Sequence, residues 1–351
     1  MRVLVATDAW HPQVNGVVRT LTSLARSAKT LGVDLEFLSP DGFRTVPLPS
    51  YPGLRLALPS SREIARRIEA AKPDAVHIAT EGPMGHWVRA YCVKHGWPFT
   101  TSYTTRFPEY ISARWPIPEG AIYAALRRFH NAAAVTMVAT PSLESELRER
   151  GFTKVGRWTR GVDTNLFNPD RAIELPFPRP IFASVGRVAV EKNLEAFLSL
   201  ELPGTKIVIG TGPALPGLQQ RFPNAKFLGQ IENGKLAAHL ASADVFVFPS
   251  LTDTFGVVQL EALASGVPVA AFPVTGPKDV IADHPVGALD QDLRAACLKA
   301  LEIPRQACRD FALQYSWENC ARQFIAHLRD VSPGRHVRSA PLGAEAAPAH
   351  G

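Results

Sequence analysis

Short runs rich in Val, Ile and Phe alternate with stretches of helical periodicity along most of the chain. In the first half these runs cover residues 2–7, 34–39, 74–79, 99–102 and 135–140, and in the second half residues 180–185, 206–210, 225–228, 245–249 and 267–272. Each run has the length of a strand, and eight of the ten contain the β-branched residues that buried strands favour. Strands that alternate with helices predict parallel sheets covered by helices on both faces, so we expect an α/β protein.

The segment 168–180, NPDRAIELPFPRP, interrupts this alternation with four prolines and a cluster of charges. It suits an extended connection, because proline restricts both itself and the residue before it. We therefore predict a first Rossmann-like domain at 1–167, a linker at 168–180 and a second Rossmann-like domain at 181–330. A last helical pattern covers residues 317–328. Residues 331–351 are rich in Pro, Gly and Ala and are expected to be disordered.

The composition is that of an ordinary globular protein large enough for two domains. The chain has 351 residues, 46% of them hydrophobic, and no run approaches the roughly 18 apolar residues that a membrane-spanning helix needs. Its opening, MRVLVATDAW, is typical of a buried strand and not of a secretory signal. The four cysteines show no metal-ligand spacing and are expected to be reduced thiols. These features favour a cytoplasmic protein whose membrane contact is peripheral.

The strongest candidate for chemistry is the segment 249–268, PSLTDTFGVVQLEALASGVP. A strand ends there, a polar loop follows, and a helix starts at about Val257. The free N–H groups at such a helix start form an anion site, for which a diphosphate is the natural occupant. Asp253 and Glu261 stand eight positions apart and can lie along one elongated ligand. The alternative is that Asp253 caps the helix and Glu261 is a solvated helix residue.

A second candidate is the segment 184–193, SVGRVAVEKN, which directly follows the first strand of the second domain. Arg187 and Lys192 leave the strand end five residues apart, where they can neutralise two phosphate groups of a leaving nucleoside diphosphate. Chemistry at this site then needs no metal. The alternative is two exposed cations on a loop. A D-x-D at Asp290 and Asp292 lies at an apparent helix start, so we interpret it as a helix cap and expect no metal site.

Two glycine loops follow strands. Gly16 lies in WHPQVNGVVRT and opens a helix, a geometry that allows close backbone approach to a phosphate or a sugar. Gly212 lies in IGTGPALPG, where Leu215 stands at a position that a dinucleotide-binding fingerprint fills with Gly or Ala. This departure argues against a nicotinamide cofactor.

The first domain offers candidates for the acceptor side. His86 begins the helix after the third strand, where it either reaches the cleft or packs. Tyr103, Thr104 and Arg106 follow the next strand. The segment 106–130 interleaves four arginines, at 106, 114, 127 and 128, with aromatic residues. Together with the formal net charge of +6, this mixture favours an anionic membrane surface, with a half-buried helix pair as the alternative. Nucleic acid is disfavoured because no nucleic-acid-binding motif accompanies the segment.

These motifs together resemble the family-4 retaining glycosyltransferases over about residues 1–330. The segment 253–261 resembles the E-x7-E signature of that family, with Asp253 in place of the first glutamate, and 186–192 resembles its G-R-x(4)-K pattern. Close relatives often read S-Y-H-T where this chain has Ser102, Tyr103, Thr104 and Thr105, so Thr104 stands in the place of a histidine. The resemblance implies the GT-B fold, in which two Rossmann-like domains face a central cleft. It also implies that the last helix, at about 317–328, packs back toward the first domain.

The resemblance also implies roles for individual residues. Arg187 and Lys192 would bind the diphosphate, and Asp253 would hold the donor sugar. These three residues would carry catalysis. Glu261 would bind the ribose. The donor site would comprise Gly16, Gly186, Arg187, Lys192, Gly212, Asp253, Thr254, Phe255, Gly256, Val257 and Glu261.

We accordingly expect a metal-independent retaining glycosyltransferase that uses a UDP- or GDP-linked sugar and no cofactor. The expected reaction transfers a hexose or hexuronate to a lipid such as diacylglycerol, at the inner face of the cytoplasmic membrane. The resemblance extends to GDP-mannose mannosyltransferases, so mannosyl transfer to a soluble or polysaccharide acceptor is an alternative. A sugar-nucleotide epimerase and a non-catalytic nucleotide-binding protein are alternatives of other classes.

Overall fold

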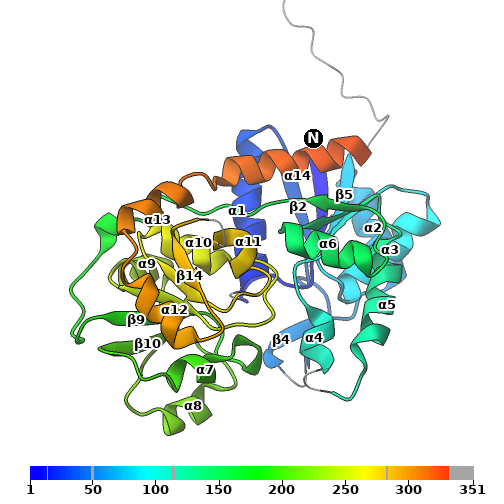
Figure 1. The fold of residues 1–351 in the computed structure, drawn as a ribbon. Coiled ribbons are helices and arrows are strands. Elements are labelled where there is room, and N and C mark those ends of the chain that lie inside the picture. Colours follow the sequence, from blue (N-terminus) through cyan, green and yellow to red (C-terminus); the bar gives the residue numbers. More distant parts are fainter. Residues whose placement is uncertain (14, 49–50, 113–114, 282–283, 332–351) are drawn as a thin grey trace, which may run out of the picture.

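The computed structural model describes residues 1–331 apart from 14, 49–50, 113–114 and 282–283. It contains two six-stranded parallel sheets, one in each half of the chain (Figure 1). The two parallel α/β domains expected from the sequence are therefore confirmed. The predicted disordered tail lies outside the described residues from position 332 onward.

The first sheet has the strand order β2-β1-β5-β6-β7-β8. Its strands are β1 (Arg2–Ala6), β2 (Asp34–Leu38), β5 (Ala75–Ile78), β6 (Thr100–Ser102), β7 (Val135–Val138) and β8 (Val155–Arg157). The helices of this domain are α1 (Gly16–Thr30), α2 (Ser61–Ala71), α3 (Pro83–Lys94), α4 (Phe107–Ser112), α5 (Glu119–His130) and α6 (Pro141–Glu149). A small antiparallel hairpin joins β3 (Thr45–Leu48) to β4 (Tyr51–Ala57). The central strands are buried on both faces, as continuous apolar runs require.

The second sheet has the strand order β11-β10-β9-β12-β13-β14. Its strands are β9 (Ile181–Val185), β10 (Thr205–Ile209), β11 (Lys226–Gly229), β12 (Val245–Phe248), β13 (Val269–Ala271) and β14 (Gly287–Leu289). The helices are α7 (Leu194–Leu198), α8 (Leu215–Arg221), α9 (Asn233–Ala241), α10 (Val257–Ala264), α11 (Pro277–Ile281), α12 (Leu293–Ala300) and α13 (Arg305–Ala312), with the 3-10 turns η1 (Pro169–Arg171) and η2 (Val190–Lys192).

The last helix, α14 (Trp317–Val331), leaves the second domain and packs on the first (orange-red in Figure 1). Its residues Cys320, Phe324 and Leu328 are buried in the same core cluster as β1 and α1. The indole N–H of Trp158 donates to the carbonyl of Cys320 at 3.2 Å. The expected return of this helix is thus confirmed, and α14 belongs physically to the first domain.

The winding of each sheet fixes where a ligand can bind. In the second sheet β9 lies between β10 and β12, so the strand order reverses between β9 and β12. In the first sheet β1 lies between β2 and β5, so the strand order reverses between β1 and β5. Loops that leave the carboxyl ends of two such strands diverge and leave a crevice. The crevice of the second sheet therefore lies beside the loops after β9 and β12.

Candidate active site

The two candidate segments of the second domain form one surface at this crevice. Lys192, in the loop after β9, places its Nζ 2.7 Å from both carboxylate oxygens of Asp253, in the loop after β12. The side-chain amide of Asn193 donates to the carbonyl of Pro249 at 3.1 Å and fixes the two loops together. Arg187 is half-buried at the end of β9. Lys192 and Asp253, which the sequence placed in separate motifs, are thus direct neighbours.

Helix α10 begins at Val257, as predicted, directly after Gly256. Gly256 has a φ of 75°, a left-handed conformation that side chains with a Cβ rarely adopt. A Cβ there would also lie 2.7 Å from the ring of Phe248. No side chain of the described residues caps this helix. The N–H of Gln259 donates to the carbonyl of Gly256 at 2.9 Å, so the N–H groups of Val257 and Val258 are the ones available to an anion.

The loop that leads into α10 is anchored on both sides. Phe255 is 5% exposed and packs in the core of the second domain, so its backbone and not its ring is available to a ligand. Thr254 reaches the other domain, where its hydroxyl donates to the carbonyl of Thr104 at 2.9 Å. This bond places Thr104, which stands where relatives have a histidine, against the loop between β12 and α10.

Glu261 lies inside α10 and is 5% exposed. Burial raises the pKa of its carboxyl, and the nearby Arg19 lowers it. Arg19 comes from α1 of the first domain and donates to both oxygens of Glu261 at 2.9 and 3.1 Å. Sequence reasoning missed Arg19, although its position one turn after Gly16 placed it near the cleft.

The three loop glycines differ in what surrounds them. A Cβ added at Gly16 or at Gly186 would meet no heavy atom of the described chain within 4 Å, so both border open space. A Cβ at Gly212 would lie 2.3 Å from the carbonyl oxygen of Val188. Gly212 therefore allows the loop after β10 to pack on the loop after β9, which is a structural role.

Of the candidates proposed for the acceptor side, His86 is exposed, whereas Thr104 is only partly exposed and its hydroxyl oxygen is buried. His86 is exposed on the first turn of α3, with its ring 4.8 Å from that of Phe129. Partial burial, and then the charge of Arg89, lower the pKa of His86. Thr104 is half-buried next to Thr254.

Tyr103 and Arg106 differ from the expectation that they face the cleft. Tyr103 is 0% exposed and packs in the core, and burial raises the pKa of its phenol. Arg106 has a side chain only 8% exposed and donates to Glu109 and Glu146, each at 2.7 Å. Burial alone would lower the pKa of Arg106, but its bonds to these two carboxylates raise it.

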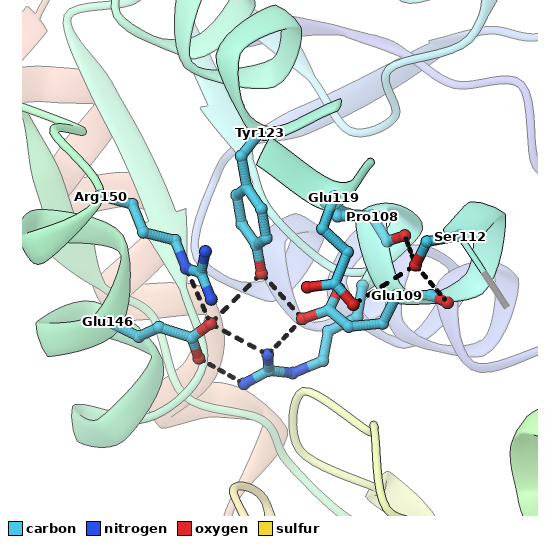
Figure 2. Close-up of polar contacts among 8 residues, drawn as sticks. Pro108, Glu109, Ser112, Glu119, Tyr123, Glu146 and Arg150 are labelled. Carbon is cyan, nitrogen blue, oxygen red and sulfur yellow. Dashed lines mark hydrogen bonds and ion pairs between the residues drawn. The ribbon is translucent and has the colours of Figure 1, made fainter. Parts of the chain in front are cut away.

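Figure 2 shows the partners of Arg106 in this network, Glu109 and Glu146, together with Tyr123, whose hydroxyl donates to Glu109 at 2.7 Å. Arg150 donates to Glu146 at 3.2 Å and stacks 3.8 Å from the ring of Tyr123. The network joins α4, α5 and α6, so Arg106 holds the acceptor-side helices in place. Arg114, another arginine of the segment 106–130, lies outside the described residues.

Two carboxylates near the crevice of the first sheet were missed as site candidates. Asp8 follows β1 and accepts from the hydroxyl of Thr80 at 2.8 Å and from the N–H of Met84 at 2.9 Å. Glu81 follows β5 and lies 3.1 Å from Nε2 of the buried His130. Each acid comes shortly after a predicted strand, and that position was the available signal.

Among the described residues, no group of three or more His, Cys, Asp or Glu side chains is arranged to hold a metal ion. Asp292 accepts from the N–H groups of Arg294 and Ala295 at 2.9 and 3.3 Å, which confirms that the D-x-D segment caps α12. Within the ranges that the structure covers, no helix is both long and apolar enough to cross a membrane.

Models of known families match both domains. The model described as Glycosyltransferase Family 4 matches residues 14–166, and the model described as Glycosyl transferases group 1 matches residues 179–302.

Curated proteins are similar over 70% to 97% of this chain. A GDP-mannose-dependent alpha-mannosyltransferase of Mycolicibacterium smegmatis is 30% identical, over 97% of this chain and 100% of that protein. A protein of the same name from Mycobacterium tuberculosis is 29% identical, over 97% of this chain and 99% of its own length. Sulfoquinovosyl transferase SQD2 of Arabidopsis thaliana is 34% identical, over 70% of this chain and 52% of that protein.

Solved structures share the fold at low identity. A sucrose-phosphate synthase from Thermosynechococcus elongatus superimposes with a TM-score of 0.76 at 18% identity, over 94% of this chain and 98% of that one. Anabaena Alr3699/HepE, solved in complex with UDP and glucose, superimposes with a TM-score of 0.70 at 15% identity, over 94% of this chain and 100% of that one.

The two facing sheets and the charged loops at the crevice of the second define a glycosyltransferase of the GT-B fold that uses a nucleotide sugar. Within this class, the chain belongs to glycosyltransferase family 4.

Proposed function

We propose that this enzyme transfers a hexose or hexuronate, with retention and without a metal, from a nucleoside diphosphate to a lipid acceptor such as diacylglycerol. The observation that carries the reaction class is the Lys192–Asp253 pair beside the N-terminus of α10. A diphosphate placed there meets the N–H groups of the helix, Lys192 and Arg187, while its sugar lies against Asp253. These cations and N–H groups stabilise the charge of the departing diphosphate, the role that a metal fills elsewhere.

The environment of Asp253 favours front-face substitution over a covalent intermediate. Both of its oxygens accept from Lys192, which weakens the carboxylate as a nucleophile. In the proposed step the bond between the anomeric carbon and the phosphate oxygen breaks. The acceptor oxygen bonds to that carbon on the same face, and its proton passes to the departing phosphate oxygen. The expected positions of Glu261 at the ribose and of Gly16 and Gly186 at the phosphates and sugar belong to this proposal.

The charge distribution supports the binding of an anionic membrane surface to the first domain. Residues 1–167 carry 21 Lys and Arg against 14 Asp and Glu, whereas residues 181–330 carry 13 against 15. Between α4 and α5, Trp115 is 44% and Ile117 is 43% exposed. Arg127 and Arg128 of α5 are exposed as well. A basic domain with exposed apolar side chains fits peripheral attachment to a membrane.

A second candidate is mannosyl transfer from GDP-mannose to a soluble or polysaccharide acceptor. The observation that favours it is the full-length similarity to proteins named GDP-mannose-dependent alpha-mannosyltransferases. The two candidates share the donor site described above and differ in the acceptor.

The test is a screen of UDP- and GDP-sugars against extracted membrane lipid and against soluble sugars, with the products identified by mass spectrometry. Transfer to lipid supports the proposal, and efficient transfer to soluble sugars alone favours the second candidate. A donor converted with no acceptor present would indicate an epimerase. Nucleotide binding without any product would indicate a non-catalytic protein.

A further inference from the structure

Arg19 crosses from the first domain to the second and touches two of its helices. It lies one turn into α1, where its backbone N–H donates to the carbonyl of Asn15 at 3.1 Å. One guanidinium nitrogen, Nη1, donates to both carboxylate oxygens of Glu261 in α10. The other, Nη2, donates to the side-chain oxygen of Asn233, the first residue of α9, at 3.1 Å.

Glu261 depends on this partner from the other domain. Its side chain is 6% exposed and lies among the buried residues of α10, whereas that of Arg19 is 31% exposed. A carboxylate in such surroundings is unfavourable unless it is paired and hydrogen-bonded. Arg19 therefore favours the ionised form of Glu261 when the two domains lie as the structure places them.

The pairing with Arg19 leaves hydrogen-bond acceptor positions on the carboxylate of Glu261 for a ligand. An ionised carboxylate offers about four acceptor positions on its two oxygens. Arg19 reaches Glu261 through a single nitrogen, so acceptor positions remain for two hydroxyl groups. A ribose with its 2′ and 3′ hydroxyls presents two neighbouring donors of the required kind.

We propose that Arg19 is a positioning residue for the ribose of the donor. It keeps Glu261 ionised and oriented, and it makes ribose recognition depend on the approach of the first domain. This inference rests on the proposed function, which assigns Glu261 to the ribose.

The test compares the binding of UDP and GDP with that of their 2′,3′-dideoxy forms by calorimetry. The full chain is used as wild type, Arg19→Met, Arg19→Lys, Glu261→Gln and the double variant Arg19→Met/Glu261→Gln. Wild type should prefer the ribonucleotide by at least about tenfold, the scale of a hydrogen bond to a charged group. Arg19→Met should reduce this preference to nearly one, and in the Glu261→Gln background it should change nothing further.

Asn233→Ala is the matched control, because it removes the outer contact of Arg19 and leaves the Glu261 contact intact. It should keep the wild-type preference, and Arg19→Lys should keep part of it. If Arg19→Met fails to fold, judged by circular dichroism, Arg19→Lys and Glu261→Gln still decide the matter: full wild-type preference in either one overturns the inference.

Two further results would also overturn it. Arg19→Met weakening both forms of the nucleotide by the same factor would make Arg19 a general clasp between domains, and an unchanged preference would make it irrelevant to the ribose. By contrast, wild type that binds neither UDP nor GDP would contradict the proposed donor site itself. The two failures are therefore distinguishable.

Discussion

The two domains use cation–carboxylate pairs in opposite ways. In the second domain Lys192 and Asp253 pair at the crevice with side chains 26% and 15% exposed. In the first, Arg106 is 8% exposed and is held by two carboxylates and, through them, by Tyr123 (Figure 2). Lys192 and Asp253 are exposed enough to take up a ligand as a further partner, whereas a buried network cannot change its partners without a large cost. The comparison separates residues to which we assign chemistry from residues that hold α4, α5 and α6 together.

The largest expected effect is on the stability of the first domain. Arg106→Met leaves Glu109 and Glu146 without their buried cation, which should lower the free energy of unfolding by about 3–5 kcal/mol. Arg150→Met is the matched control, because Arg150 also contacts Glu146 but is 40% exposed and should cost about 1 kcal/mol or less. Urea denaturation measures both. Equal losses in the two variants would show that burial of the network is not what makes Arg106 important.

The next effect is on catalysis in the second domain. Lys192→Ala and Arg187→Ala each remove a contact that strengthens as the diphosphate departs, so each should cost roughly 2–4 kcal/mol of transition-state stabilisation with folding unchanged. Lys299→Ala is the control, since Lys299 pairs with Asp290 at 2.8 Å in the same domain but outside the crevice. The measurement is kcat/KM with a fixed donor and acceptor. Wild-type values for both Lys192→Ala and Arg187→Ala would mean that these cations do not serve the diphosphate.

A smaller effect is expected on membrane binding. Each cation near an anionic leaflet contributes about 1 kcal/mol, so Arg127→Glu/Arg128→Glu should reduce binding to anionic liposomes by about 30-fold or more. Lys226→Glu/Lys235→Glu makes the same change of net charge on the exposed surface of the second domain and should have little effect. Cosedimentation at low and high salt measures both. If the wild type binds no better to liposomes with anionic lipid than to those without, the segment around Trp115 has a structural role only.

Most strands of the two sheets could be predicted because they are buried apolar runs separated by helical patterns. All ten predicted strand runs contain strands of the structure. The strands β8 and β14 were missed because each lies at the edge of a sheet and is only partly buried. The hairpin strands β3 and β4 were missed as well. The return of α14 was predictable in direction, but its contact with Trp158 depends on residues far apart in the chain.

The residues of the proposed donor site that are close together in the sequence could be predicted from it. Asp253, the start of α10 and Glu261 lie within one strand-loop-helix unit, so local pattern and family resemblance both indicate them. The pairing of Lys192 with Asp253 joins residues 61 positions apart, and that of Arg19 with Glu261 joins residues 242 apart. No local pattern encodes such contacts, because the packing of separate loops and domains creates them. Tyr103 shows the same limit, since its position after a strand does not reveal that its ring turns into the core.

The central claim is that cations and a helix N-terminus, not a metal, support transfer with retention. The most direct measurement is the anomeric configuration of the product, determined by NMR, from a reaction run in excess EDTA. The account predicts undiminished turnover and a product with the anomeric configuration of the donor. Turnover that stops in EDTA and returns with Mg²⁺ or Mn²⁺, or a product of inverted configuration, would contradict it.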